Sequence, residues 1–335
     1  MRQCFLFAAA LLVLSTPVAA DLAADGDWHE AAVAPVDAPV MSTSPFGLAD
    51  AARGDAPAQA ASVRYFPAIG ASAAMPAPAV ILLHGAGGVS RSREGRYARE
   101  LAGQGVAVAV VDVFGPRDTG DFIERLMTTT EAMALADAFA TLAWLDARPE
   151  VDAARTALIG FSYGAMSSVY ASYRQVAETY DPPLAFAAHV AFYGPCIARF
   201  EDVTTTGAPV LMLWGDRDAI VDPAQCRLLA DDLRRGGSAV TVRHYDARHR
   251  WDGSQRQWKA PVHIAGCRFT VDADNTVRDT YSTLTMTDAA TRATILSLCA
   301  SRDGYLIGGD EAVRRRSNAD LAAFLNPVLF PHAPD

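Results

Sequence analysis

The stretch Thr156-Ala-Leu-Ile-Gly-Phe-Ser-Tyr-Gly164 decides the fold of this chain. Residues 156–161 are apolar over the length of a buried strand, and residues 163–178 have the spacing of a helix. Gly160 and Gly164 suit a tight strand-to-helix turn, because a Cβ at either position would clash. Such a turn would hold the Ser162 hydroxyl at the carboxyl edge of a sheet, where ligands bind. The alternative is that Ser162 only caps the helix.

Strands and helices alternate on both sides of this turn. Residues 131–147 form the clearest predicted helix, because their apolar side chains recur at helical spacing. Continuous apolar strands separated by helices are typical of a mostly parallel central sheet with helices on both faces, so the predicted fold class is α/β. The other predicted strands span residues 62–66, 79–84, 106–113, 185–192, 209–214 and 239–245, and the other helices span 95–104, 222–235 and 318–325.

The first twenty residues, 1–20, predict a secretory signal peptide. Arg2 gives a positive amino-terminal charge, residues 5–14 are an unbroken apolar run, and small residues end the segment at Ala20. A membrane anchor is the alternative, but this run is about half as long as a bilayer core requires. We therefore expect cleavage after Ala20 and an exported protein, periplasmic or secreted, whose mature chain does not insert into a membrane.

The rest of the chain is predicted to form one domain with two additions. Residues 21–61 are rich in Ala, Pro, Asp and Gly, and they are expected to be a leader that wraps the surface, with room for one edge strand. Residues 62–335 form the predicted domain. The polar stretch 252–309 interrupts the alternation of strands and helices and is expected to be an insertion. The chain length requires no second domain.

Composition excludes several classes of function. The chain has 29 basic and 38 acidic residues and a net charge of −9, whereas a duplex-binding protein needs a basic face, so no nucleic acid partner is expected. Lys259 is the only lysine, and no glycine-rich turn stands beside it. A phosphate-binding P-loop is thereby excluded, and covalent catalysis by a lysine is not expected.

Candidates for an acid and a base follow Ser162 along the chain, in the order that serine hydrolases built on such a turn use. Asp218 lies beyond the predicted strand 209–214, far enough past the turn to reach the sheet edge, and Asp216 is the alternative acid. His249 follows the last predicted strand, on a loop that can reach the serine. Ser162, Asp218 and His249 are therefore the predicted nucleophile, orienting acid and general base.

A glycine-rich loop, His84-Gly-Ala-Gly-Gly88, follows the predicted strand 79–84. Its glycines would let backbone N–H groups face a substrate. The N–H groups of Ala86 and Tyr163 are the predicted donors to the oxyanion of a tetrahedral intermediate. The loop also begins like a dinucleotide-binding fingerprint, but Ser90 occupies the third glycine position, so a dinucleotide cofactor is not expected.

Removal of the signal would leave four cysteines, Cys196, Cys226, Cys267 and Cys299. An even number in an exported chain suggests disulfides, with three possible pairings, and unpaired buried thiols are the alternative. No Cys-x-x-Cys occurs, so a structural zinc site has no support. The sequence implies neither a metal nor a cofactor.

Together these motifs resemble the α/β-hydrolase superfamily and, within it, the dienelactone hydrolase family. The resemblance covers roughly residues 80–251 and the closing helix. It rests on the loop 84–88, Val110-Val-Asp-Val-Phe-Gly-Pro-Arg117, the turn 160–164, Gly215-Asp-Arg-Asp218 and Ala247-Arg-His249-Arg-Trp251. The Phe-Gly-Pro-Arg step is the more particular family mark. No mechanistic role is evident for Arg117. The alternative interpretation is that Arg117 simply anchors a loop through hydrogen bonds.

The resemblance implies an α/β-hydrolase fold and the pairings Cys196–Cys226 and Cys267–Cys299. The founding family members use a cysteine nucleophile where Ser162 stands here, and the insertion and export signal are unlike a cytoplasmic catabolic enzyme. An exported esterase that cleaves a small-molecule carboxylic ester through an acyl-enzyme therefore fits better than a dienelactone hydrolase. A serine peptidase or acyltransferase using the same residues, and a catalytically silent binding protein, are the alternatives. The exact substrate and the oligomeric state stay open.

Overall fold

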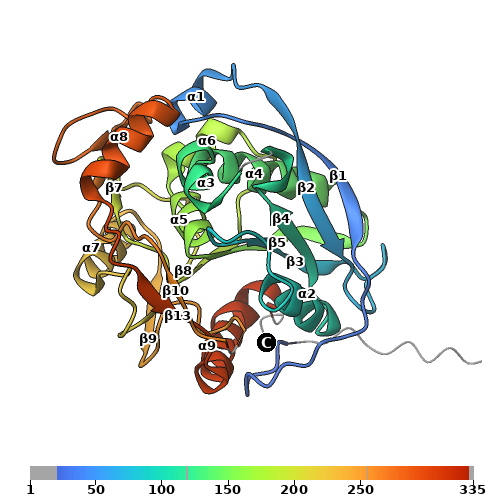
Figure 1. Ribbon diagram of the computed structural model, residues 1–335. Helices are drawn as coiled ribbons and strands as arrows, with labels where there is room; N and C mark the ends of the chain where they lie inside the picture. The colour runs from blue at the N-terminus through green and yellow to red at the C-terminus, as the bar shows by residue number, and fades with distance from the viewer. Residues whose placement is uncertain (1–20, 118–119, 255, 332–335) are drawn as a thin grey trace, which may run out of the picture.

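The computed structural model of the chain describes residues 21–117, 120–254 and 256–331. The expected signal peptide lies outside these residues. An eight-stranded sheet in the order β1-β2-β4-β3-β5-β6-β8-β9 forms the centre, and Figure 1 shows helices on both of its faces. Its strands are β1 (Val36–Thr43), β2 (Ala58–Phe66), β3 (Ala77–Leu83), β4 (Ala107–Asp112), β5 (Val151–Phe161), β6 (Ala188–Phe192), β8 (Val210–Gly215) and β9 (Val240–Tyr245).

The sheet is mostly parallel, as the apolar strands predict. Every neighbouring pair from β4 to β9 is parallel, whereas β2 pairs antiparallel with both β1 and β4. All seven residues of β3 are buried, because helices cover both faces of the sheet. The strands β2 and β5 begin several residues before the predicted ones, at Ala58 and Val151. The fold class is therefore α/β, and the loops that follow the parallel strands lie at the carboxyl ends of those strands.

Helices α4 and α5 pack on one face of the sheet, and α2 and α9 pack on the other (Figure 1). Within the described ranges, no helix is both long enough and apolar enough to cross a membrane. The helices are α1 (Leu48–Arg53), α2 (Glu94–Gly103), α3 (Phe122–Thr128), α4 (Glu131–Asp146), α5 (Tyr163–Tyr170), α6 (Arg174–Tyr180), α7 (Pro223–Arg235), α8 (Ala289–Cys299) and α9 (Glu311–Leu329).

The single helix predicted over residues 163–178 is wrong, because the structure has α5 and α6 there. Tyr173 separates them with an extended backbone, at φ −76° and ψ 135°. The next N–H group, of Arg174, donates to the carbonyl oxygen of Thr204 at 2.9 Å. The Tyr173 ring is fully buried and stacks on Phe200, with 3.9 Å between ring centroids. The helix therefore breaks where an aromatic ring enters the core.

The closing helix α9 begins seven residues before the predicted start at residue 318. Its first turns carry charged and polar side chains, so apolar spacing did not mark them. Arg314 is nevertheless only 2% exposed, and its guanidinium donates to Glu100 of α2 at 2.6 Å. The Tyr97 hydroxyl of α2 donates to Asn318 at 3.0 Å. Polar contacts thus hold α9 to α2 beneath the sheet.

The stretch 252–309 contributes α8, a two-stranded sheet and two strands of a three-stranded sheet. One sheet pairs β10 (Trp258–Ala260) with β13 (Tyr305–Ile307), and the other places β11 (Phe269–Val271) between β12 (Val277–Asp279) and β7 (Ala198–Phe200). A disulfide joins Cys267 to Cys299 at the end of α8, and a second joins Cys196 to Cys226 of α7. These are the two pairings that the family resemblance implies, and the structure confirms them.

His189 in β6 is a buried titratable group, 1% exposed. Burial lowers the pKa of its imidazole to about 4, and the backbone of Ser168 offsets this only in part. In the unfolded chain the same residue takes up a proton as the pH falls below about 6.5, whereas the folded chain keeps it neutral to about pH 4. The associated stability is therefore present above pH 6.5 and is lost as the pH falls through 4.

His189 should accordingly account for a loss of about 3 kcal/mol in the free energy of unfolding between pH 7 and pH 4, at about 1.4 kcal/mol per pKa unit. The variant His189→Leu carries no titratable group there, so its loss over the same interval should be smaller by that amount. Urea unfolding of both proteins at the two pH values measures the difference. Equal losses would contradict the prediction.

Candidate active site

Ser162 lies on a strained turn between β5 and α5. Its backbone has φ 53° and ψ −106°, a conformation that a non-glycine residue adopts only where its surroundings enforce it. A Cβ at Gly160 would lie 2.0 Å from the carbonyl oxygen of Gly164, and one at Gly164 would lie 2.4 Å from that of Leu83. Both glycines are therefore required, and the predicted strand–turn–helix geometry is present.

His249 lies on the loop after β9 and is 4% exposed. Its Nε2 is 2.9 Å from the Oγ of Ser162. The imidazole ring packs edge-on against the ring of Tyr193, with 4.6 Å between centroids. The backbone carbonyl oxygen of His249 accepts a hydrogen bond from the N–H group of Gly308 at 3.2 Å. Contacts from the segment after β6 and from the end of β13 thus fix the imidazole against the serine.

Asp218 completes the arrangement from the loop after β8. Its Oδ2 is 2.7 Å from the Nδ1 of His249, and its Oδ1 accepts a hydrogen bond from the N–H group of Ile220 at 3.0 Å. Because the carboxylate can only accept, Nδ1 carries the proton and Nε2 presents a lone pair to the Ser162 hydroxyl. The structure therefore brings Ser162, His249 and Asp218 together in one hydrogen-bonded row.

The alternative acid, Asp216, lies elsewhere. It is exposed on the surface and contacts the Nδ1 of His244 at 3.0 Å. Asp222 is also occupied, because it caps the start of α7 through the N–H groups of Ala224 and Gln225. Among the three aspartates near β8, only Asp218 contacts His249.

The loop after β3 approaches Ser162 closely. A Cβ at Gly85 would lie 3.4 Å from the Cβ of Ser162. The buried His84 fixes this loop: its Nε2 accepts from the N–H group of Val113 at 3.0 Å, and its Nδ1 donates to the carbonyl oxygen of Gly85 at 2.8 Å. Burial lowers the pKa of His84, which agrees with the neutral ring that these two bonds require.

Both predicted oxyanion donors border this site. Ala86 and Tyr163 line the same cavity beside Ser162. Within residues 21–117, 120–254 and 256–331, the structure gives no hydrogen-bond acceptor to either backbone N–H group. The neighbouring N–H groups of the turn are already bonded: that of Ser162 donates to the carbonyl oxygen of Phe192 at 2.9 Å, and that of Gly164 to the carbonyl oxygen of His84 at 3.1 Å. Two N–H donors are thereby left for a ligand near the serine hydroxyl.

A buried polar network lies beside His249, and no motif in the sequence predicts it. The Tyr193 hydroxyl donates to Oδ1 of Asp252 at 2.6 Å and lies 3.5 Å from the guanidinium of Arg93. Arg93 pairs in turn with Glu94, and both are almost fully buried. Burial raises the pKa of Asp252 and that of Tyr193. The network holds Tyr193 against the imidazole. The sequence did not predict it, because Arg93 and Glu94 stand at the start of α2, where charged residues are usually exposed.

Arg117 anchors a loop through hydrogen bonds. Its guanidinium donates to both carboxylate oxygens of Asp137 in α4, at 2.7 and 3.1 Å, and to the carbonyl oxygen of Val113 at 2.8 Å. It also reaches the Ser44 hydroxyl, just beyond β1, at 3.0 Å. The loop after β4, which precedes α3, is thereby tied to α4 and to the N-terminal segment. The structure confirms the anchoring interpretation.

This sheet, with a serine turn after its central strand β5, defines an α/β-hydrolase. The family model of the dienelactone hydrolase family matches residues 66–274, more than half of the chain. The chain therefore belongs to the dienelactone hydrolase family and is a hydrolase that acts on ester bonds. Within the described ranges, no group of three or more His, Cys, Asp or Glu side chains could hold a metal ion.

Comparison with solved structures gives distant likenesses. A dienelactone hydrolase-like promiscuous phosphotriesterase from metagenomic libraries is 23% identical, with 65% of this chain and 84% of that chain covered and a TM-score of 0.46. A thermophilic esterase from the Planctomycetes species Thermogutta terrifontis is 14% identical, with 58% and 81% covered and a TM-score of 0.45. No curated protein matches the chain.

Proposed function

We propose that the chain is an exported serine esterase that cleaves a small-molecule carboxylic ester through an acyl-enzyme. The observation that carries this proposal is the hydrogen-bonded row in which Asp218 lies 2.7 Å from His249 and His249 lies 2.9 Å from Ser162. These distances suit proton transfer from the serine hydroxyl to the imidazole without rearrangement. Asp218 orients the ring and stabilises its charged form.

In this mechanism the Oγ of Ser162 attacks the ester carbonyl carbon while its proton moves to Nε2 of His249. The N–H groups of Ala86 and Tyr163 donate to the oxyanion of the tetrahedral intermediate. His249 then gives the proton to the leaving alcohol oxygen, and the acyl group stays on Ser162. A water molecule, deprotonated by His249, attacks the acyl carbonyl, and the acid leaves as the serine recovers its proton.

Replacing Ser162 with Ala should lower kcat/KM for p-nitrophenyl acetate on the order of 10⁶-fold, because no oxygen remains to form the acyl-enzyme. A fluorophosphonate should phosphonylate Ser162 with loss of fluoride, so the wild-type protein gains the mass of the phosphonyl group and the variant does not. Circular dichroism of the variant controls for folding. A folded Ser162→Ala protein with unchanged activity would overturn the proposed mechanism.

Asp218 and Asp216 offer a matched pair of substitutions. Asp218→Asn should lower kcat on the order of 10⁴-fold, because the amide would favour the wrong imidazole tautomer, as the same substitution does in the Ser-His-Asp triad of serine proteases. Asp216→Asn changes the same chemical group at an exposed position and should leave kcat within about twofold. Steady-state kinetics of both variants decide between the aspartates. The reverse ranking would transfer the role to Asp216.

Export is supported by the two disulfides, because such bonds persist in oxidising compartments. The signal layout of residues 1–20 adds to this support. N-terminal sequencing of the protein from the exported fraction of a bacterial expression host should begin at Asp21. Recovery of the intact N-terminus with the cells' cytoplasm would contradict export.

A further inference from the structure

Two adjoining cavities are both lined by Ser162, and they share Ala86, Phe122 and Tyr305 as well. We call the first the His-side cleft, about 210 Å³, lined by Ser162, His249, Gly87, Arg250, Trp258 and Tyr305. We call the second the Met-side cavity, about 50 Å³, lined by Ser162, Met166, Pro195, Ile220, Ile264 and Leu296. His249 lines the first and not the second. An ester bound at Ser162 therefore has two chemically different directions for its two substituents.

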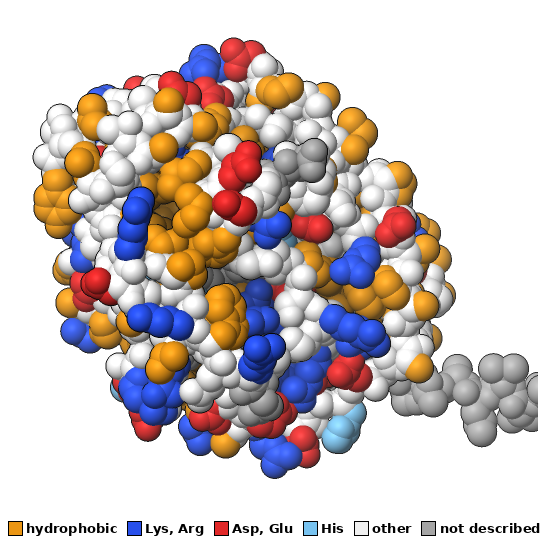
Figure 2. Space-filling model, viewed as in Figure 1, with side chains coloured by type: hydrophobic (Ala, Val, Ile, Leu, Met, Phe, Trp, Pro, Cys, Tyr) orange, Lys and Arg blue, Asp and Glu red, His pale blue; other side chains and the backbone are white. Residues whose placement is uncertain are grey.

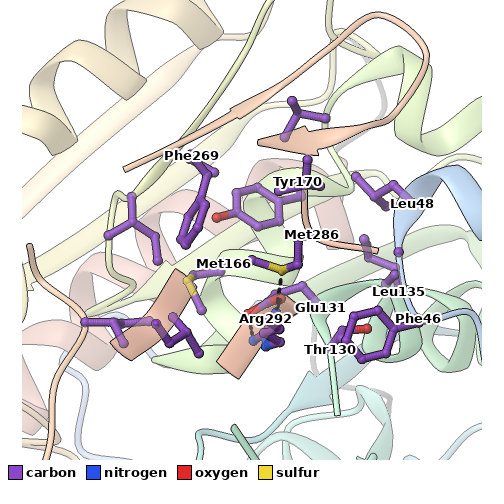
Figure 3. A pocket seen from close by; sticks show the side chains of 18 residues that line it. Phe46, Leu48, Thr130, Glu131, Leu135, Met166, Tyr170, Phe269, Met286 and Arg292 are labelled. Carbon is purple, nitrogen blue, oxygen red and sulfur yellow. Dashed lines mark hydrogen bonds and ion pairs between the residues drawn. The ribbon is translucent and has the colours of Figure 1, made fainter. Parts of the chain in front are cut away.

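A third cavity, the inner cavity of about 60 Å³, continues from the Met-side cavity away from the serine. Glu131, Met166, Ile264, Arg292 and Leu296 line both, so the two adjoin. Figure 3 shows the inner cavity, where Met166, Met286, Tyr170 and Phe269 surround its apolar part. On the face in Figure 2, hydrophobic side chains gather around a hollow between the regions of α3 and α8.

An ion pair lies at the junction of these cavities, and its two side chains bond to each other. Arg292 of α8 donates to both carboxylate oxygens of Glu131, at 3.1 and 3.2 Å. It also donates to the carbonyl oxygen of Leu126 at 2.7 Å and contacts the sulfur of Met286 at 3.4 Å (Figure 3). The positive charge of the Arg292 guanidinium is thus balanced by the carboxylate of Glu131. The surrounding walls are mostly aliphatic, thioether and aromatic groups, and the polar exceptions include His263 in the Met-side cavity and Thr130 in the inner cavity.

The mechanism assigns the two directions. His249 must protonate the leaving alcohol oxygen, so the alcohol has to depart on the side of the imidazole, through the His-side cleft. The acyl group, held on Ser162 with its oxygen toward the N–H groups of Ala86 and Tyr163, is then left the Met-side cavity, which His249 does not line. On that side the walls are mostly apolar. A charged acyl group would lose its solvation there, since Arg292 and Glu131 already pair with each other and His263 is one of few other polar side chains in the lining.

We propose that the Met-side and inner cavities together form the acyl site of this enzyme and take an unbranched alkyl chain of a few methylene groups, an inference that rests on the proposed function. The volumes support the short chain. Together the two cavities, at about 50 and 60 Å³, are smaller than an apolar protein cavity of roughly 150 Å³, which is large enough to bind benzene. Ile264 and Leu296, which stand at their junction, come from the stretch 252–309, so this stretch sets the acyl specificity.

A chain-length series tests the site directly. Burial of each methylene is worth about a fourfold gain, so kcat/KM should rise on the order of 10²-fold from p-nitrophenyl acetate to hexanoate. It should rise no further for dodecanoate, which exceeds the cavities. A matched series of acetate esters of ethanol, butanol and hexanol varies the alcohol instead, and it should show a much shallower dependence. A flat acyl series beside a steep alcohol series would overturn the assignment.

Two substitutions fill the junction. Leu296→Trp and Ile264→Trp should each lower the ratio of hexanoate to acetate kcat/KM at least tenfold, because the indole would occupy the passage to the inner cavity. The control is Leu298→Trp on the same helix, whose side chain is 65% exposed. It should keep the wild-type ratio. Wild-type ratios in both junction variants would overturn the proposal, and two positions guard against one variant failing to fold.

A binding measurement separates this inference from the proposed function. Calorimetric titration of Ser162→Ala with neutral ketones should give a Kd for 2-hexanone about 16-fold below that for 2-butanone, at about fourfold per methylene. Adding Leu296→Trp should abolish this preference. An intact preference in a protein that hydrolyses no ester would retain the site and overturn the proposed function. Ester hydrolysis without the ketone preference would overturn the site alone.

Discussion

The close backbone approach around Ser162 is the constraint on which the rest of the site depends. The N–H group of Ser162 donates to the carbonyl oxygen of Phe192 at 2.9 Å, and that of Gly164 donates to the carbonyl oxygen of His84 at 3.1 Å. The turn is thereby bonded to the ends of both strands that neighbour β5. The glycine loop after β3 and Tyr193 after β6 must then border the serine. The strand order β3-β5-β6 thus determines which loops meet there.

The parts of the fold that sequence could predict are those with a local cause. Apolar runs gave the parallel strands, and the spacing of Gly160, Ser162 and Gly164 gave the turn. The candidates Asp218 and His249 followed from chain order and from positions just past strand ends. The break at Tyr173 could not be foreseen, because it depends on a ring stacking against Phe200, which lies 27 residues away. Helical spacing continues across that break in the sequence.

The buried ionic contacts lay beyond the sequence for a different physical reason. Arginines are the great majority of the basic residues in this chain, so their type does not distinguish a surface charge from a buried one. Arg314 is buried because Glu100 lies across from it, and Arg93 because Glu94 and Tyr193 enclose it. Such partners compensate the loss of hydration, and most stand far apart in the sequence. Only the folded chain brings Arg314 to Glu100 and Arg93 to Tyr193.

Helix α8 is attached at both of its ends by bonds that do not involve the serine turn. Its last residue, Cys299, is covalently joined to Cys267, and near its start Arg292 grips Glu131 of α4. The side of the proposed acyl site that α8 forms is therefore held independently of the serine turn. Changes to its inward side chains can accumulate across relatives without disturbing the backbone that strains Ser162. The selectivity of such an enzyme can drift while its chemistry stays constant.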